Sequence, residues 1–94
     1  MSADMHCCLI KSFGRTVRLL REARQWSQEY LAEVADLNRS YVGEIERGRV
    51  VASILTIEKI AAAFGVPSSR LLEQSEVALA GQMVKGIELV AIAC

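Results

Sequence analysis

The sequence has no excess charge of either sign and almost no histidine. Eleven basic and eleven acidic residues cancel over 94 residues, so the net charge predicts no strong attraction to nucleic acid or to acidic membranes. The single histidine, His6, lies near the N-terminus, and the chain contains no glycine-rich phosphate loop. We therefore expect no enzyme active site, and nothing in the sequence indicates a cofactor or a small-molecule ligand.

Cysteines are few and poorly spaced. Cys7 and Cys8 are adjacent and Cys94 is the last residue, a pattern that gives neither a metal-ligand spacing nor a disulfide framework. A metal site at His6, Cys7 and Cys8 would lack a fourth ligand, so we expect no bound metal. No signal-peptide pattern is visible, and charged and polar residues interrupt every apolar run that approaches the roughly twenty residues of a membrane span. These features favour a cytoplasmic protein.

The sequence does contain a series of short helical patterns, without one convincing alternating strand. Apolar residues recur at helical spacing from Leu9 onward, which predicts a first helix that ends near Arg24. Three N-cap residues then predict helices over about 28–35, 39–47 and 54–64; the caps are Ser27, Asn38 and Ser53. A short fifth helix should begin at Pro67. We expect a flexible tail over residues 1–8 and an all-α domain over residues 9–75.

Residues 76–94 have a different composition. They are almost wholly apolar apart from Gln82, Lys85 and Glu88, which would form one polar line along a helix. We expect a helix here, although "IELVAIA" is also acceptable as a strand. This segment could fold back on its own chain or pair with a second copy. The candidate dimer-interface residues are apolar side chains of the tail and of the loop "RVVAS", namely Val50, Val51, Leu79, Met83, Ile87 and Val90.

A helix-turn-helix pattern spans Gln28 to Arg47. Its apolar positions are those that two steeply crossing helices need for a shared core: Leu31, Ala32, Ala35, Leu37, Val42 and Ile45. The longer stretch "FGRTVRLLREARQWSQEYLAEVADLNRSYVGEIERG", followed by "SILTIEKIAAAFGVPSSRLL", resembles the lambda-repressor-like (Xre/Cro) family. Within that family it looks like the small controller regulators of bacterial restriction-modification systems.

This resemblance implies a five-helix all-α DNA-binding domain that acts on operators as a dimer, here with an additional apolar C-terminal segment. It also implies a partly buried ion pair between Arg21 and Glu46. One departure is the loop containing Val50 and Val51, where many relatives carry polar residues. Valines cannot bind phosphate through a charge, and they form an apolar spot that would suit a protein interface.

The predicted third helix supplies the candidate residues for reading bases, because side chains from the first turns of such a helix reach base edges in the major groove. These residues are Asn38, Arg39, Ser40, Gly43 and Glu44. Arg39 is suited to a two-pronged contact with guanine, and Gly43 leaves room for a close approach. Glu44 could accept from the cytosine amino group or repel wrong sequences. Candidates for phosphate binding are Gln28, Tyr41, Arg47 and Arg49.

The sequence thus predicts a sequence-specific transcriptional regulator that binds a palindromic DNA operator as a homodimer through its third helix. On a generic helix the same polar residues would simply be solvated. The alternative function is a protein-interaction module, such as the antitoxin or anti-repressor partner of a neighbouring gene product.

Overall fold

The computed structural model describes residues 2–85, and the side chains of residues 8–77. Five helices occupy the described residues, which contain no strand, as the all-α prediction requires. Their bounds are α1 Ser2–Ala23, α2 Gln28–Ala35, α3 Arg39–Glu46, α4 Ile54–Phe64 and α5 Ser68–Lys85. No helix in this part of the chain has both the length and the apolar character to cross a bilayer.

The three central helices begin and end at local sequence signals. Ser27, Asn38 and Ser53 lie in extended backbone before α2, α3 and α4, and each side-chain oxygen accepts from a backbone N–H of the first turn. Helix α2 ends at Asp36 and α4 at Gly65, both in the left-handed backbone region that stops a helix.

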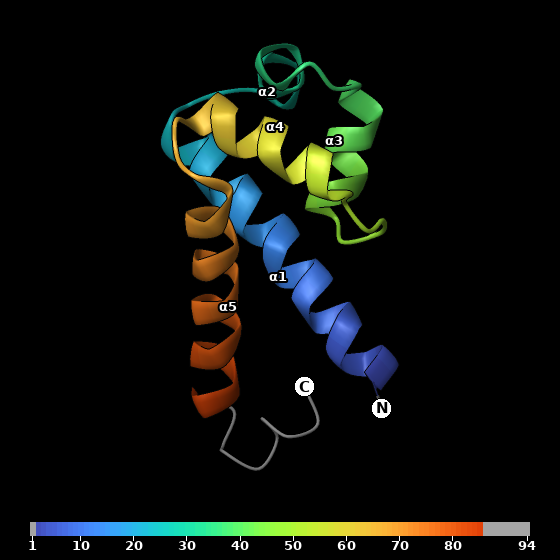
Figure 1. Cartoon of the computed structure of the whole chain (residues 1–94), viewed down its shortest axis with the longest axis vertical. Helices are drawn as coiled ribbons and strands as arrows, with labels where there is room; N and C mark the ends of the chain where they lie inside the picture. Colours follow the sequence, from blue (N-terminus) through green and yellow to red (C-terminus); the bar gives the residue numbers. More distant parts are fainter. Residues whose placement is uncertain (1, 86–94) are drawn as a thin grey trace.

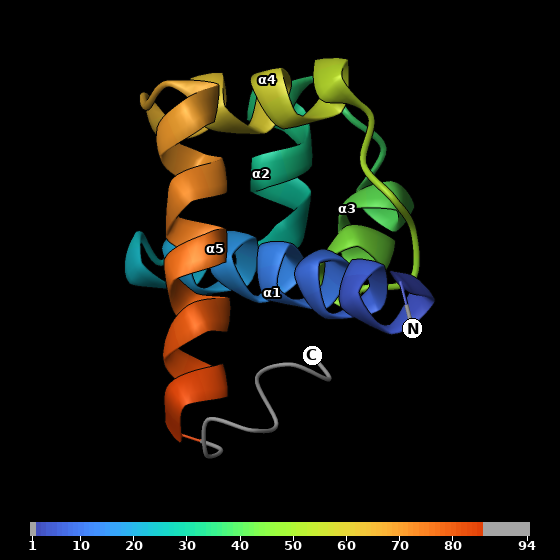
Figure 2. The ribbon, with the colours of Figure 1, turned by 60° about the horizontal axis from the view of Figure 1, so that its bottom comes forward.

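The helices form a packed cluster from which two long helices diverge. Figure 1 shows α2, α3 and α4 gathered at one end, with α1 and α5 extending away from it, and Figure 2 shows α1 passing beneath α2 and α3. Helix α1 packs against α3 and α5, and α2 packs against α3 and α4. The core between them consists of Phe13, Val17, Leu31, Ala32, Ala35, Val42, Ile45, Ile60, Ala61, Phe64 and Leu71.

Both terminal helices differ from the sequence prediction. Helix α1 begins at Ser2, so the predicted flexible tail over residues 1–8 is wrong for residues 2–8. No glycine or proline precedes Gly14, so nothing interrupts the backbone hydrogen bonds there. Helix α5 continues to Lys85 without a break at residue 76, because Gly81 is tolerated inside it. The strand alternative for "IELVAIA" lies outside the described residues.

Cys8 is disulfide-bonded in the structure, whereas the sequence analysis expected no disulfide framework. The cysteine spacing gave no signal for this bond, because such a pairing depends on how the chain folds rather than on distance along it. Two buried serines lie where α1 packs on α5. The Ser12 hydroxyl of α1 donates to the Ser75 carbonyl of α5 at 2.7 Å, and the Ser75 hydroxyl donates to the Leu71 carbonyl within α5 at 3.0 Å.

Candidate nucleic-acid interface

Helices α2 and α3 form a compact helix-turn-helix. Only three residues, Asp36 to Asn38, separate them. Asp36 adopts the left-handed conformation with φ of 59°, and the Leu37 N–H then donates to the Ala32 carbonyl at 2.8 Å. Ala32, Ala35 and Val42 are all buried in the shared core, where the small alanine side chains allow the two helices to approach closely. This packing fixes the direction of α3 relative to α2.

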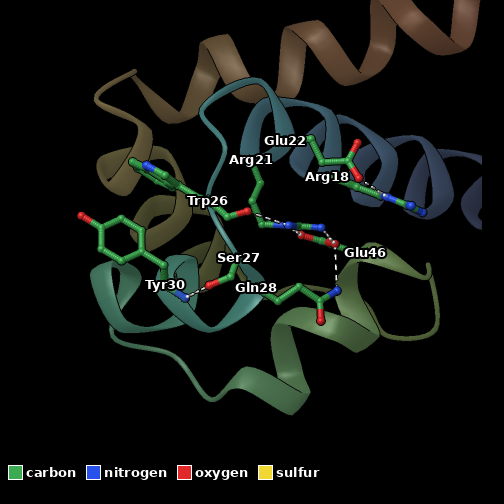
Figure 3. A network of polar contacts seen from close by, with 8 residues as sticks. All are labelled: Arg18, Arg21, Glu22, Trp26, Ser27, Gln28, Tyr30 and Glu46. Carbon is green, nitrogen blue, oxygen red and sulfur yellow. Dashed lines mark hydrogen bonds and ion pairs between the residues drawn. The ribbon is translucent and has the colours of Figure 1, made fainter.

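A buried carboxylate joins the helix-turn-helix to α1 (Figure 3). Glu46 at the end of α3 accepts from two nitrogens of Arg21, Nε at 2.7 Å and Nη2 at 3.0 Å, and Arg21 Nη1 donates to the Trp26 carbonyl at 2.8 Å. The Glu46 side chain is 3% exposed. The hydrogen bonds that Arg21 donates to Glu46 raise the pKa of Arg21, although burial opposes that shift. Arg21 and Glu46 therefore form the ion pair that the resemblance implies.

Gln28 at the first position of α2 belongs to the same network. Its Nε2 donates to Glu46 Oε1 at 3.0 Å, so its carboxamide is held rather than free to rotate. One further N–H of this amide and the backbone N–H groups of Gln28 and Glu29 are the donors available to an anion, because the Tyr30 N–H already donates to Ser27. The predicted phosphate contact of Gln28 therefore stays a prediction.

The first turn of α3 is open. Asn38, Arg39 and Ser40 are all exposed. The Asn38 Oδ1 accepts from the Ser40 N–H at 2.7 Å as the N-cap, while the side chains of Arg39 and Ser40 make no hydrogen bond or ion pair with the described residues. These two side chains are the most accessible of the predicted base-reading group.

The second turn of α3 is covered. Arg47 Nη2 donates to Glu44 Oε2 at 2.8 Å, and a Cβ placed on Gly43 would lie 3.3 Å from that same nitrogen. Gly43 is buried, and the Arg47 guanidinium lies over it. The expected room for a close approach at Gly43 therefore stays a prediction, and it requires the flexible end of Arg47 to move.

Two other predicted DNA contacts have different surroundings. The Tyr41 hydroxyl lies 3.2 Å from the Thr56 hydroxyl of α4, so this ring links α3 to α4 and only part of its hydrogen-bonding capacity remains. Arg49 is exposed in the loop that follows α3. Its predicted role as a phosphate ligand is compatible with that position.

Of the four basic residues of α1, Arg18 and Arg21 form ion pairs within the chain, and Arg24, just after the helix, is also held by contacts with other residues. Arg18 pairs with Glu22 at 3.0 Å, and the Arg24 Nη2 donates to the Phe64 carbonyl at 2.7 Å while its guanidinium lies over the Trp26 ring. Lys11 and Arg15, by contrast, form no ion pair with a described residue.

The loop after α3 exposes apolar side chains that the sequence analysis named only in part. Val50 is half-buried against the core, whereas Val51 is 72% exposed. Ile54 and Leu55, at the start of α4, are 86% and 59% exposed. Sequence reasoning missed these two residues, although two adjacent large apolar residues straight after an N-cap were a usable signal. Of the tail candidates, Leu79 and Met83 lie on α5, and Ile87 and Val90 fall outside the described residues.

Comparison with known proteins agrees with this geometry. The model of the Helix-turn-helix family matches residues 17–71. The chain belongs to this helix-turn-helix family. The lambda-repressor-like prediction is thereby confirmed, including its likeness to controller proteins.

Individual helix-turn-helix relatives include control protein C.BamHI of Bacillus amyloliquefaciens, which is 45% identical over 65% of this chain and 76% of its own length. The immunity repressor protein of Bacillus phage phi105 is 39% identical over 63% of this chain, which spans only 41% of that relative. The crystal structure of the restriction-modification controller protein C.AhdI from Aeromonas hydrophila is 42% identical and superposes with a TM-score of 0.64, covering 66% of this chain and 94% of that one. These helix-turn-helix proteins bear the names of repressors and controllers rather than of enzymes.

Proposed function

We propose that this chain is a sequence-specific DNA-binding transcriptional regulator that inserts α3 into the major groove of a palindromic operator and acts as a homodimer. The observation that carries the proposal is the open first turn of α3, where Arg39 and Ser40 project from a helix whose other face is fixed in the core. An exposed arginine at this place is suited to guanine, which offers two acceptors side by side. Restriction control is the regulatory setting suggested by C.BamHI and C.AhdI.

The proposed dimer surface is the apolar patch of Val51, Ile54 and Leu55. Three large apolar side chains that stand mostly in solvent are costly unless a partner covers them. The patch directly follows α3, and a dimer on a palindrome must bring its two α3 helices to successive major grooves on one side of the duplex. A surface beside α3 meets that requirement.

The test is selection from a pool of randomised duplexes, followed by gel-shift titration of the selected duplex. Arg39→Ala should weaken binding to the selected duplex by about 1–3 kcal/mol, because it removes one base-specific contact. Gln28→Ala should weaken binding more evenly across sequences. The matched control is Arg70→Ala, which removes an exposed arginine from α5.

Two outcomes would count against the proposal. One is the absence of any protein-dependent shift at low salt. The other is an Arg39→Ala variant that binds the selected duplex as tightly as the wild type. The second result, together with co-purification of a neighbouring gene product, would favour the protein-interaction module instead.

A further inference from the structure

The second turn of α3 is masked by its own side chains. The Glu44–Arg47 ion pair at 2.8 Å draws the guanidinium across the helix, where its three outer atoms lie 3.3–3.6 Å from the position of a Cβ on Gly43. The half-exposed Arg47 side chain therefore lies along the helix surface, paired with Glu44, and does not reach away from the helix as an unpaired phosphate ligand would.

The covered second turn of α3 lies on the same face of the helix as the open first turn. Ser40, Glu44 and Arg47 follow one another at intervals of four and three residues, which places them along one side of an α-helix. A major groove that meets Arg39 and Ser40 must also meet the ion pair. The pair is therefore part of the DNA-facing surface, and its state matters for binding.

The ion pair can exchange partners readily. The Arg47 and Glu44 side chains are 50% and 36% exposed, and pairs this accessible contribute little to stability. An arginine that moves from a carboxylate to a phosphate keeps a charged partner. Glu44 does not have that option, because a carboxylate left alone among phosphates is repelled, and only a base amino group in the groove can satisfy it.

Resting on the proposed DNA-binding function, we propose that Arg47 moves from Glu44 to a phosphate only on duplexes that offer Glu44 a base amino group. On all other duplexes the pair stays closed, and Arg47 adds nothing to binding. The ion pair thus converts a phosphate contact, which normally carries no sequence information, into one that depends on sequence.

The test compares two labelled duplexes by fluorescence anisotropy with the full chain: the duplex selected by the wild type and a scrambled duplex of equal composition. Arg47→Ala should weaken binding to the selected duplex about tenfold and to the scrambled duplex less than about twofold. Glu44→Gln should strengthen binding to the scrambled duplex about tenfold, because it releases Arg47 there and removes a repelled charge.

Glu22→Gln is the matched control. It changes the net charge by the same amount and breaks a similarly exposed pair, Arg18–Glu22, on α1. It should change both affinities less than about twofold. An equal gain from Glu22→Gln and Glu44→Gln would show that net charge alone is responsible, and this would overturn the proposal.

Salt dependence supplies a second readout. For each duplex, the slope of the logarithm of the association constant against the logarithm of the salt concentration reports the number of counterions released. The wild type should release about one more counterion on the selected duplex than on the scrambled one, and Glu44→Gln should remove this difference. An Arg47→Ala variant that loses the same affinity on both duplexes would show an ordinary phosphate ligand and refute the switch. If the wild type selects no duplex, the proposed function itself fails, and this inference fails with it.

Discussion

Gly14 is the residue at which α1 comes closest to α3. A Cβ at this position would overlap the Ile45 carbonyl oxygen and lie 2.9 Å from the Glu46 carbonyl oxygen. Backbone atoms cannot move aside as the end of a side chain can. We expect Gly14→Ala to lower the free energy of unfolding by about 3 kcal/mol, measured by urea denaturation, because the two helices would have to separate.

Gly43 provides the matched control within a helix. A Cβ there would meet only the flexible end of Arg47, at 3.3 Å. Gly43→Ala should therefore leave stability unchanged or raise it by up to about 1 kcal/mol, through the better helix propensity of alanine. Equal tolerance of the two substitutions would contradict the close packing of α1 on α3.

Glu46 is the second residue on which stability depends. Glu46→Ala should lower the free energy of unfolding by about 3 kcal/mol, because it leaves the Arg21 side chain, only 11% exposed, without its charged partner. The exposed pair gives the comparison: Glu22→Ala should change stability by less than about 0.5 kcal/mol in the same urea titration. Similar losses from both variants would disprove a special role for the buried pair.

The pH dependence of this pair follows from the raised pKa of Arg21. A group whose pKa is raised on folding contributes its full stabilisation below its unfolded pKa, and loses it only as the pH rises through the folded value. Since the Arg21 pKa is raised from an already strongly basic value, its charge contributes throughout the neutral and moderately alkaline range.

At the scale of the helix, Ser53 is the cap whose removal is easiest to measure. Its hydroxyl accepts from the Thr56 N–H at 3.1 Å and donates to the Thr56 hydroxyl at 2.9 Å. Ser53→Ala should lower the free energy of unfolding by about 1 kcal/mol. Ser69→Ala removes an exposed hydroxyl near the start of α5 and should have almost no effect. A cap variant as stable as this control would be evidence against the capping role.

The bounds of α2, α3 and α4 were predictable because the residues at the helix ends determine them. Ser27, Asn38 and Ser53 each precede a helix as the sequence indicated, and Gly65 ends α4. The start of α1 and the end of α5 were less predictable, because helix propensity changes gradually in those segments and no strong breaker marks a limit.

Side-chain contacts of the candidate site were the part that sequence could not supply. Helical spacing placed Glu44 and Arg47 on the exposed face of α3, yet it could not show that their pairing would bury Gly43. Nor could it show that Tyr41 would meet Thr56, fifteen residues away on another helix. Long side chains have several rotamers, and tertiary packing selects among them.

At the scale of the whole molecule, the proposed homodimer can be tested at the apolar patch. Ile54→Ser should raise the dimer dissociation constant by up to about a thousandfold, measured by sedimentation equilibrium, because the homodimer buries two copies of this isoleucine and each is worth about 2 kcal/mol. Leu19→Ser is the matched control, since Leu19 is an exposed apolar residue of α1. Dissociation caused by Leu19→Ser instead would place the interface on the α1 side.

The single carboxylate of Glu46 has a consequence for redesigning this protein. Within the eight residues of α3, Val42, Gly43 and Ile45 face inward, and Glu46 joins this helix to both α1 and α2. Arg39 and Ser40 can be substituted without disturbing the contacts of Glu46 with α1 and α2. The DNA sequence that α3 binds can therefore be changed by substitutions at its outward positions alone. If α3 were grafted onto another protein, that protein would need an arginine equivalent to Arg21 to pair with Glu46.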